Sequence, residues 1–577
     1  MIKVLAKSIR EYKKYTLAAP LFMAGECLFE CLIPFVMSKL IDSLENTQMA
    51  MVYQYGGILL VMAMCSLFCG CMSARNAATA GCGFAKNLRH DMFYKIQEFA
   101  FGDVDKFSSS SLVTRMTTDV TNVQNAFGMF IRMAFRVPFL FIFSIIMGCN
   151  INVKLTMIFV CIMPFLVFAI IMIAKKVMAI FKRIFKKYDA LNNSVQENIN
   201  GIRVVKAFVK EDFEIEKFHN ASAEVRDDFI YAEKNMALFH PIMMLCMNVG
   251  MLLVCYFGAK VIVTTSGSEL STGQLSSLMS YGVQILSGLM MFAMIFVMAT
   301  IAGEAANRIA EVLIYEPTLV SKEDGIKEVK DGSIEFENVN FRYEKARKNA
   351  LNNINLSIKP GQTIGIIGGT GSSKSTLIQL ISRLYDVTEG SVKVGGVDVR
   401  DYDLTALRDQ VAVVLQKNVL FAGTIKENMR WGNENATDEE IMAACKDACA
   451  HEFIETFPDG YNTMIEQGGS NVSGGQKQRL CIARALLKKP KILILDDSTS
   501  AVDTRTDALI RQTFKDKIPD TTKIIIAQRV SSVQDADRIL VMEKGSIVEE
   551  GTAAELIAKG GIYAEIHQHQ TQGREAS

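Results

Sequence analysis

Residues 363–384 read TIGIIGGTGSSKSTLIQLISRL, and this stretch decides the fold of the second half of the chain. A short apolar run, Thr363–Ile367, precedes a loop rich in glycine and serine, Gly368–Ser375, and an apolar helical pattern follows. Strand, glycine-rich loop and helix in this order predict a phosphate-binding loop, in which backbone N–H groups and the helix N-terminus hold the phosphates. We therefore expect ATP to bind here, with Lys374 reaching the β- and γ-phosphates and Ser375 binding Mg²⁺.

The loop departs from the usual pattern G-x-x-x-x-G-K-[ST] at one position. Ser373 stands where the second glycine is expected, and a serine restricts the backbone there. Phosphate binding mainly uses backbone N–H groups, which serine still supplies, so we expect ATP binding to be retained. The residues predicted to bind ATP in this segment are Gly368, Gly369, Thr370, Gly371, Ser372, Ser373, Lys374, Ser375 and Thr376.

Short β-rich runs alternate with helical patterns from Ser333 onward. They include IEFENVNF at 334–341, VAVVLQ at 411–416 and KILILD at 491–496. This alternation predicts an α/β domain with a mostly parallel sheet. The composition changes near Glu316, and the polar residues that follow predict a linker.

The first half of the chain is dominated by charge-free apolar runs. About twenty apolar residues are needed to cross the hydrocarbon layer of a membrane, and several runs reach this length. The six predicted spans are Leu17–Leu40, Met51–Ala74, Val137–Val153 with an extension back through Phe127–Ala134, Leu155–Ala174, Asn235–Ala259 and Leu270–Gly303.

Basic residues are distributed unevenly between the segments that connect the spans. Twelve Lys or Arg lie in residues 175–234, six in 75–126 and five in the first sixteen residues, whereas the alternate segments hold only Lys154 and Lys260. Lysine and arginine mark the cytoplasmic side, so we expect both termini to be cytoplasmic. The net charge of +1 over 577 residues gives no support to nucleic-acid binding.

These patterns together predict five segments. They are an amphipathic N-terminal helix over 1–16, a transmembrane domain over 17–316, a linker over 317–332, a nucleotide-binding domain over 333–570 and a C-terminal tail over 571–577.

A second motif and a second strand follow the phosphate loop. Val472–Arg479 reads VSGGQKQR, and the strand Ile492–Leu495 ends in Asp496-Asp497. A phosphate loop, SGGQ and a strand ending in aspartate, in this order, resemble the ATP-binding cassette (ABC) family. Six spans ahead of one cassette are similar to a half-transporter of the exporter type. The resemblance implies a type I ABC exporter fold in the plasma (inner) membrane of a bacterium.

The resemblance implies roles for further residues. Tyr343 resembles the aromatic residue that stacks on adenine, and Asp496 is similar to the aspartate that holds Mg²⁺ through water. Gln416 resembles the glutamine that senses the γ-phosphate and the metal. The resemblance assigns the signature motif to Ser473, Gly474, Gly475 and Gln476, the loop that links the two nucleotide sites to Ser500 and Asp503, and metal ligands to Ser375, Gln416 and Asp496.

Two catalytic positions depart from the family pattern. Asp497 replaces the glutamate that polarises the attacking water, and its side chain is one methylene shorter. Gln528, in IIAQR, replaces a histidine and cannot carry positive charge into the transition state. With Gln416 these residues form the expected catalytic set of an impaired site.

Three substitutions, at Ser373, Asp497 and Gln528, therefore fall on one expected site, whereas the signature motif is intact. In this family two cassettes enclose two ATP molecules, each between one phosphate loop and the other signature. The pattern favours one half of a heterodimer that exports amphiphilic or lipid-like compounds, with a homodimer as the alternative. An ATP-gated channel or sensor of the same architecture is the alternative function.

Two further hypotheses concern the first half of the chain. Glu26 and Glu30 lie within a predicted span, where unpaired carboxylates are costly, so we expect them to face the bundle interior. Pairing of Glu30 with Arg132, with Arg136 or with a helix terminus is one interpretation, and attraction of cationic substrates is another. The short segments 108–118 and 201–209 are predicted to dock onto cassettes, the first onto either cassette and the second onto that of the partner.

Overall fold

The computed structural model describes the backbone of residues 1–322, 324–344, 346–498 and 501–575. Side chains are described over the same residues, apart from positions 174, 178, 179, 182, 185, 186, 189, 290, 293, 294, 296, 297, 301 and 571–575. The chain forms two compact units. Unit 1 comprises Met1–Gln97 and Ser110–Tyr315, and unit 2 comprises Glu98–Ser109 and Glu316–Ser577.

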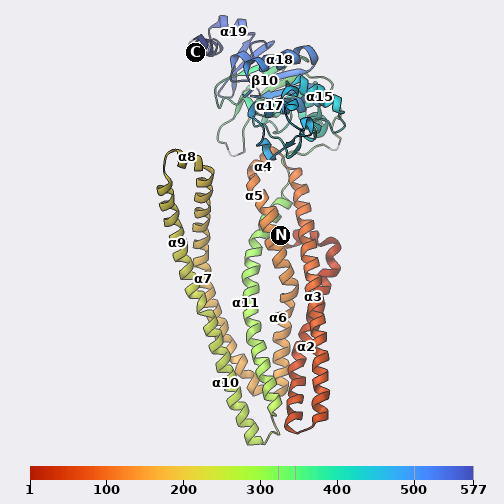
Figure 1. Ribbon diagram of the computed structural model, residues 1–577, viewed down its shortest axis with the longest axis vertical. Helices are drawn as coiled ribbons and strands as arrows, with labels where there is room; N and C mark the ends of the chain where they lie inside the picture. Colours follow the sequence, from red (N-terminus) through yellow and green to blue (C-terminus); the bar gives the residue numbers. More distant parts are fainter. Residues whose placement is uncertain (323, 345, 499–500, 576–577) are drawn as a thin grey trace. The chain divides into compact units, whose positions relative to one another are not determined.

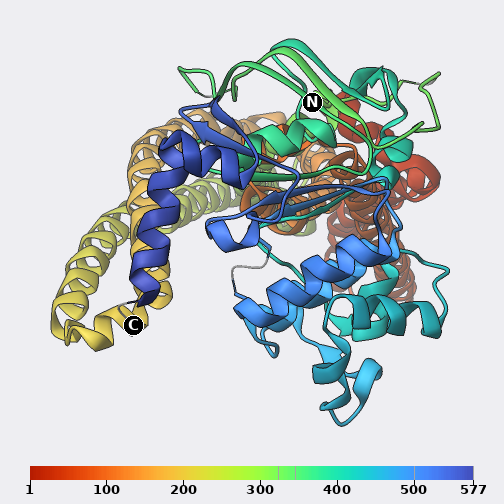
Figure 2. The ribbon, with the colours of Figure 1, turned by 90° about the horizontal axis from the view of Figure 1, so that it is seen from above.

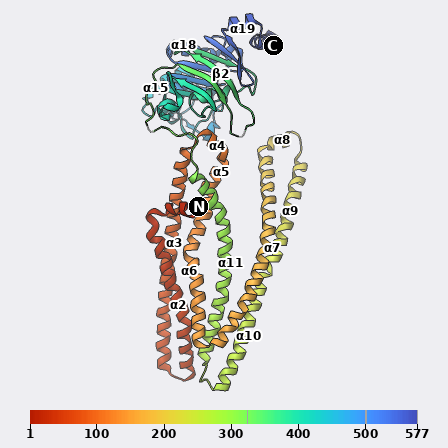
Figure 3. The same cartoon turned by 180° about the vertical axis from the view of Figure 1, so that it is seen from behind.

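Unit 1 is built from helices, several of them very long. Figures 1 and 3 show α7 and α9 running side by side and joined at one end by α8. The helices are α1 (Ile2–Ala6), α2 (Lys13–Glu45), α3 (Met49–Gln97), α5 (Ser109–Thr114), α6 (Val120–Ile151), α7 (Val153–Asn200), α8 (Ile202–Ala207), α9 (Glu211–Ala237), α10 (Phe239–Thr265) and α11 (Thr272–Ile314), with a 3₁₀ turn η1 (Lys7–Tyr12) and a π-helical turn η2 (Arg115–Asp119).

The predicted spans fall on α2, α3, α6, α7, α10 and α11. Over the described residues, five helical stretches are long and apolar enough to cross a membrane, and they include the first five of these helices. The sixth, α11, has 43 residues. Asn152 separates α6 from α7 because its backbone is extended and its side chain accepts a hydrogen bond from Leu155 N at 3.1 Å.

An ion triad holds α2 against α6 within the span region. Arg136 donates to Glu26 Oε1 at 2.8 Å and to the two carboxylate oxygens of Glu30 at 2.7 and 3.0 Å. The side chain of Arg136 is 17% exposed. The hypothesis that Glu30 pairs with Arg136 is confirmed, and Glu26 shares the same guanidinium.

Unit 2 contains a six-stranded sheet, with the order β12-β11-β3-β10-β9-β6, a four-stranded sheet, β2-β1-β4-β5, and a small pair, β7-β8. Figure 2 shows the green strands of the four-stranded sheet along one side of the unit and the cyan and blue helices along another. The strands are β1 (Ile334–Phe341), β2 (Leu351–Ile358), β3 (Thr363–Ile367), β4 (Glu389–Val394), β5 (Val397–Asp398), β6 (Val411–Val414), β7 (Gly423–Thr424), β8 (Met464–Ile465), β9 (Ile492–Asp496), β10 (Thr522–Ile526), β11 (Arg538–Glu543) and β12 (Ser546–Gly551).

Helices cover the larger sheet and fill its connections. The α-helices of unit 2 are α4 (Phe101–Phe107), α12 (Lys374–Ile381), α13 (Leu404–Gln410), α14 (Ile425–Arg430), α15 (Asp438–Asp447), α16 (His451–Glu455), α17 (Gly474–Leu487), α18 (Thr504–Lys517), α19 (Ala553–Lys559) and α20 (Ile562–Glu575). The 3₁₀ turns are η3 (Val399–Asp401), η4 (Gly460–Asn462), η5 (Gln467–Gly469) and η6 (Val530–Ser532).

The core of unit 2 follows from the alternation of side chains along buried strands. On β9, Ile492 and Ile494 pack into the cluster that includes β1 and β2, whereas Leu493 and Leu495 pack into the cluster that includes α17. Successive side chains of a strand point to opposite faces, so a strand covered on both faces reads as a continuous apolar run. This accounts for the sequence ILIL.

The segment predicted to dock, 108–118, only partly coincides with the part of the chain that packs into unit 2. Unit 2 takes Glu98–Ser109, which contains α4, whereas residues from Ser110 onward belong to unit 1. Ser108 ends α4 with a φ of 60°, so the serine run marks the break between helices, as predicted. The helix that packs into unit 2 therefore precedes this break, and docking of 108–118 onto a cassette stays a prediction.

We expect Arg136→Met to destabilise unit 1 by about 3–5 kcal/mol, because it leaves two carboxylates without their shared cation. The triple variant Glu26→Gln, Glu30→Gln, Arg136→Met removes every charge of the triad and should recover most of this loss. Ten of the thirteen cysteines lie in the first half of the chain, so thermal unfolding followed with a thiol-reactive dye reports on unit 1. Equal midpoints for wild type and Arg136→Met would contradict the prediction.

Candidate nucleotide site

Four parallel strands bring the predicted site residues to one edge of the six-stranded sheet. β3, β10, β9 and β6 are neighbours and run parallel, with Ile526 of β10 opposite Ile366 of β3 and Asp496 of β9. The carboxyl ends of parallel strands meet at one edge, which is where ligands bind in open α/β sheets. The phosphate loop, Asp497, Gln528 and Gln416 each follow one of these strands, and Asp496 is the last residue of β9.

The phosphate loop has a backbone that requires glycine at its start. Gly368 has a φ of 157°, and a Cβ there would lie 2.3 Å from Met542 O. Lys374 Nζ donates to the carbonyl oxygens of Gly368 and Gly369 at 2.9 Å each, so the side chain folds back over the loop. Burial lowers the pKa of Lys374, and the nearby charges of Asp496 and Asp497 oppose this effect. The loop thus holds a cation where phosphates are expected.

Ser373 adopts the conformation that the missing glycine would favour. Its φ is 71° and its ψ is 26°, in the left-handed region, and it caps α12 from that position. A side chain in this region costs about 1–2 kcal/mol relative to glycine. The substitution therefore leaves the loop geometry in place and stores strain in it.

Asp496 lies beside the expected metal ligand of the loop. Burial raises the pKa of Asp496, and a hydrogen bond with Ser375 opposes the rise. A hydroxyl and a carboxylate are hard oxygen donors of the kind that Mg²⁺ prefers. These two residues fit the binding of Mg²⁺, the ion that would neutralise phosphate charge there.

The two departures from the family pattern contact each other. Gln528 Nε2 donates to Asp497 Oδ2 at 2.8 Å, and Gln416 also hydrogen-bonds the Asp497 side chain. Burial raises the pKa of Asp497, while the bond from Gln528 lowers it. Asp497 has a φ of 49°, held by its N–H bond to Ile526 O at 3.0 Å. The structure therefore brings together all three residues predicted as the catalytic set.

Gln570 of α20 hydrogen-bonds the backbone of the loop that carries Gln528. Its side-chain amide donates to Gln528 O at 2.9 Å and accepts from Val530 N at 2.8 Å. No sequence motif points to Gln570, because its partners are backbone groups.

Tyr343 follows β1 in sequence and lies close in space to the first turn of α12, the helix after the phosphate loop. Its hydroxyl shares a hydrogen bond of 3.0 Å with Thr376 Oγ1, and the ring stands edge-on to Phe341 at a centroid distance of 4.8 Å. The aromatic ring predicted to stack on adenine is thus anchored to α12.

The signature motif forms the N-terminus of α17. Ser473 Oγ accepts from Gln476 N at 3.3 Å, and Gln476 Oε1 accepts from Ser473 N at 2.9 Å, so the two residues form a capping box. Ser473 and Gly474 are exposed. A Cβ on Gly475 would lie 2.8 Å from Ala501 O, which explains the glycine there.

The loop predicted to link the two nucleotide sites is only partly described. Ser500 lies outside the described residues. Asp503 caps α18 and accepts from the backbone N–H groups of Arg505 and Thr506. Gln478 of α17 accepts from Ala501 N at 3.0 Å, so this loop is fixed to the signature helix.

Comparison with known proteins supports the same interpretation of fold and site. Residues 16–290 match the family described as ABC transporter transmembrane region, and residues 351–500 match the family described as ABC transporter. An uncharacterised ABC transporter ATP-binding protein of Bacillus subtilis, YfiB, is 37% identical over 99% of this chain and 100% of its own length. An uncharacterised ABC transporter ATP-binding protein of Mycobacterium tuberculosis is 32% identical, over 99% and 98% of the two chains.

The fold also matches a solved structure. A bacterial Atm1-family ABC exporter with ATP bound superposes with a TM-score of 0.83, covering 97% of this chain and 98% of that one at 22% identity. A transmembrane helical domain followed by an α/β nucleotide-binding domain is the type I ABC exporter fold. The chain belongs to the ABC transporter family. It has the fold of an exporter half-transporter, with a transmembrane region and an ATP-binding cassette in one chain.

We expect Ser373→Gly to stabilise unit 2 by about 1 kcal/mol, because it removes the strain of a serine at positive φ. Thr370→Gly is the matched control. Thr370 does not have a positive φ, so glycine there should cost about 0.5–1 kcal/mol through added freedom of the unfolded chain. Trp431, the one tryptophan of the chain, lies in unit 2, and its fluorescence in urea reports the transition. Shifts of the same sign for both variants would refute the assignment of strain.

Proposed function

We propose that this chain is the impaired-site half of a heterodimeric exporter of amphiphilic or lipid-like compounds. ATP binding to both cassettes closes them and turns the helices outward, and hydrolysis occurs mainly at the other site. The single observation that carries the proposal is the hydrogen bond of 2.8 Å between Gln528 and Asp497. The two replaced residues face each other where hydrolysis would take place.

This contact explains how the site binds ATP without hydrolysing it efficiently. Asp497 already accepts hydrogen bonds from Gln528 and Gln416, and its side chain is one methylene shorter than glutamate. A general base must reach the proton it removes. A carboxylate on a shorter side chain that already accepts two hydrogen bonds is therefore a poor base. Gln528 is neutral and adds no positive charge to the transition state. The phosphate loop and Lys374 remain suited to binding.

The intact signature motif supports a second half of the proposal. Ser473 and Gly474 are exposed at the N-terminus of α17, where N–H groups and the helix dipole attract phosphate. We propose that they complete the ATP site of the partner. A homodimer would combine two impaired sites in one molecule, so we favour a heterodimer.

Charge on two surfaces also favours a different partner chain. In unit 1, the predicted docking segment 201–209 contains α8 and carries Arg203 and Lys206 and no acidic residue, although Lys206 pairs with Glu211 just beyond the segment at 3.0 Å. It also exposes apolar side chains, including Phe208 at 71%. This is the segment predicted to dock onto the cassette of the partner.

Unit 2 contains a groove of about 420 Å³ that would receive such a segment from the partner. Phe421 and Trp431 stack at its edge, with centroids 4.2 Å apart. Its basic lining residues are Arg408, Lys417, Arg484 and Lys488, and none of the described residues that line it is acidic. In a homodimer, a basic segment would enter a basic groove, and like charges would repel.

Steady-state ATPase of the purified complex, with each change made in this chain, tests the asymmetry. Ser473→Ala should lower the rate roughly 10²- to 10³-fold, because it removes a hydrogen bond to developing phosphate charge at the partner's site. Asp497→Glu with Gln528→His should change the rate only modestly. Lys374→Ala should fall between these limits. If Lys374→Ala or Asp497→Ala abolishes hydrolysis as fully as Ser473→Ala, this site is catalytic and the asymmetry is wrong.

The partner assignment has its own test. We expect Val204→Cys with Val419→Cys, in a chain without its native cysteines, to give no disulfide between copies of this chain. Val204 is 60% exposed on α8 and Val419 is 43% exposed at the groove. Val204→Cys labelled with a photoactivatable maleimide should instead crosslink to the copurifying partner on irradiation. Crosslinked pairs of this chain in membranes would establish a homodimer.

Transport itself is tested in inverted vesicles with Hoechst 33342 and an NBD-labelled phospholipid. ATP-dependent accumulation of either probe supports export. Ion current in a planar bilayer without accumulation would identify an ATP-gated channel instead.

A further inference from the structure

Tyr385 lies between α4 and the tyrosine predicted to stack on adenine. Its ring stands edge-on to that of Tyr343, with centroids 5.3 Å apart and planes at 86°. Its hydroxyl donates to Asp105 Oδ2 of α4 at 2.8 Å. Phe101, also on α4, meets the same ring at 6.4 Å. One side chain of unit 2 therefore contacts both Tyr343 and the helix that connects α3 to α5 in sequence.

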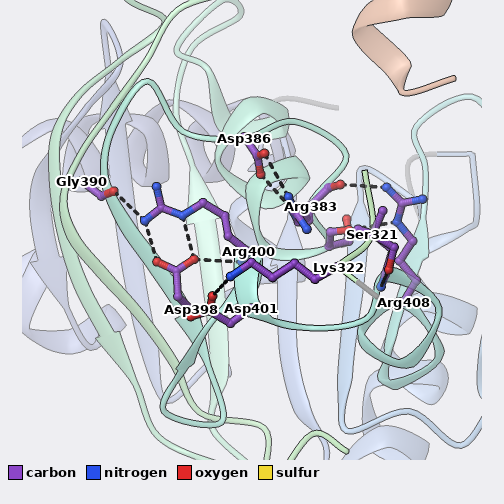
Figure 4. A network of polar contacts seen from close by, with 11 residues as sticks. Ser321, Lys322, Arg383, Asp386, Gly390, Asp398, Arg400, Asp401 and Arg408 are labelled. Atoms are coloured by element: carbon purple, nitrogen blue, oxygen red, sulfur yellow. Dashed lines mark hydrogen bonds and ion pairs between the residues drawn. The ribbon is translucent and has the colours of Figure 1, made fainter. Parts of the chain in front are cut away.

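The turn that carries Tyr385 is held from both sides. Arg383 donates to both carboxylate oxygens of Asp386, at 2.8 and 3.2 Å, and Arg408 donates to Arg383 O at 2.8 Å (Figure 4). Bidentate pairs of this kind are directional and strong. The backbone at Tyr385 is thus fixed. When the ring of Tyr343 moves, the side chain of Tyr385 moves with it while its backbone stays in place.

The contact between Tyr385 and α4 is a strong one. A hydrogen bond from a hydroxyl to a carboxylate is about twice as strong as one between neutral groups. Burial raises the pKa of Tyr385, and the hydrogen bond to Asp105 and its negative charge raise it further. The phenol therefore remains a proton donor throughout the neutral pH range.

Space for movement lies next to these contacts. A cavity of about 330 Å³ is lined by α4, by the start of the chain after α11 and by both tyrosines. The other attachment of α4 is buried: Asp103 accepts from Thr318 N at 3.1 Å and from Ala100 N at 2.9 Å. Asp103 thus fixes the helix to the chain leaving α11, while Tyr385 joins it to the nucleotide side.

We infer that Tyr385 is a positioning residue that couples occupation of the adenine site to the position of α4. The inference rests on the nucleotide role proposed for Tyr343. Adenine stacking restricts the position of the Tyr343 ring. The edge-on contact then restricts the ring of Tyr385, and the hydrogen bond from its hydroxyl restricts Asp105 of α4. A ligand shifts a conformational equilibrium only through contacts that differ between the two states, and this chain of contacts supplies that difference.

Hydrogen–deuterium exchange of residues 98–109 tests the inference in the full-length chain, purified with its partner, with and without the ATP analogue AMP-PNP. In wild type, the analogue should slow exchange in this segment. Tyr385→Phe keeps the ring and removes the hydroxyl, and it should lower this nucleotide-dependent protection roughly tenfold. Asp105→Ala, an exposed substitution on α4, should have the same effect from the other side.

Tyr461→Phe is the matched control. It removes a hydroxyl that hydrogen-bonds His451 Nδ1 at 2.9 Å elsewhere in unit 2, and it should leave the protection of residues 98–109 unchanged. Affinity for MANT-ATP should stay within about twofold of wild type in Tyr385→Phe, because the edge-on ring contact with Tyr343 is retained.

The outcomes separate this inference from the proposed function. If Tyr343→Ala leaves MANT-ATP affinity unchanged, the proposed role of Tyr343 is wrong. In a second outcome, Tyr343→Ala weakens MANT-ATP binding, and AMP-PNP slows exchange of residues 98–109 as much in Tyr385→Phe as in wild type. In that case only the coupling is wrong. If Tyr385→Phe accelerates exchange equally with and without nucleotide, Tyr385 is merely an anchor, and the coupling is again overturned.

Discussion

The parallel pairing of β3, β10, β9 and β6 is the constraint on which the site depends. Apart from Asp496 at the end of β9, the polar groups of the site lie beyond the strands, and the common direction of the strands places four loops at one edge. Loops of different length and composition thereby meet at a single position. A shift of one residue in register would exchange the side chains that a strand buries on its two faces and separate Asp497 from Gln528.

The sequence was sufficient to predict those parts of the molecule that follow a local pattern. The phosphate loop needs glycine at fixed positions, the spans need length without charge, and the strand ILIL needs cover on both faces. The meeting of Asp497 and Gln528 also followed, because the resemblance to the ABC family assigns both residues to one nucleotide site.

Other features depend on contacts between distant residues and could not be predicted in this way. α4 was missed because its attachment relies on Tyr385, whose partner Asp105 is 280 positions away in the chain. Gln570 binds backbone atoms and leaves no motif. The sequence leaves open whether Glu30 pairs with Arg132 or Arg136, and it does not predict that Glu26 shares the same guanidinium, because both depend on which face of α6 meets α2.

The placement of α4 within unit 2 has a consequence for synthesis of the protein. Asp105 leaves the ribosome 280 residues before Tyr385, which at about 5–20 residues per second corresponds to roughly 15 s to 1 min. During that interval, α4 has no surface to fold against, although α3 and α6 on either side of it are already present. The cassette therefore completes its fold around a helix made much earlier, and the two units mature together.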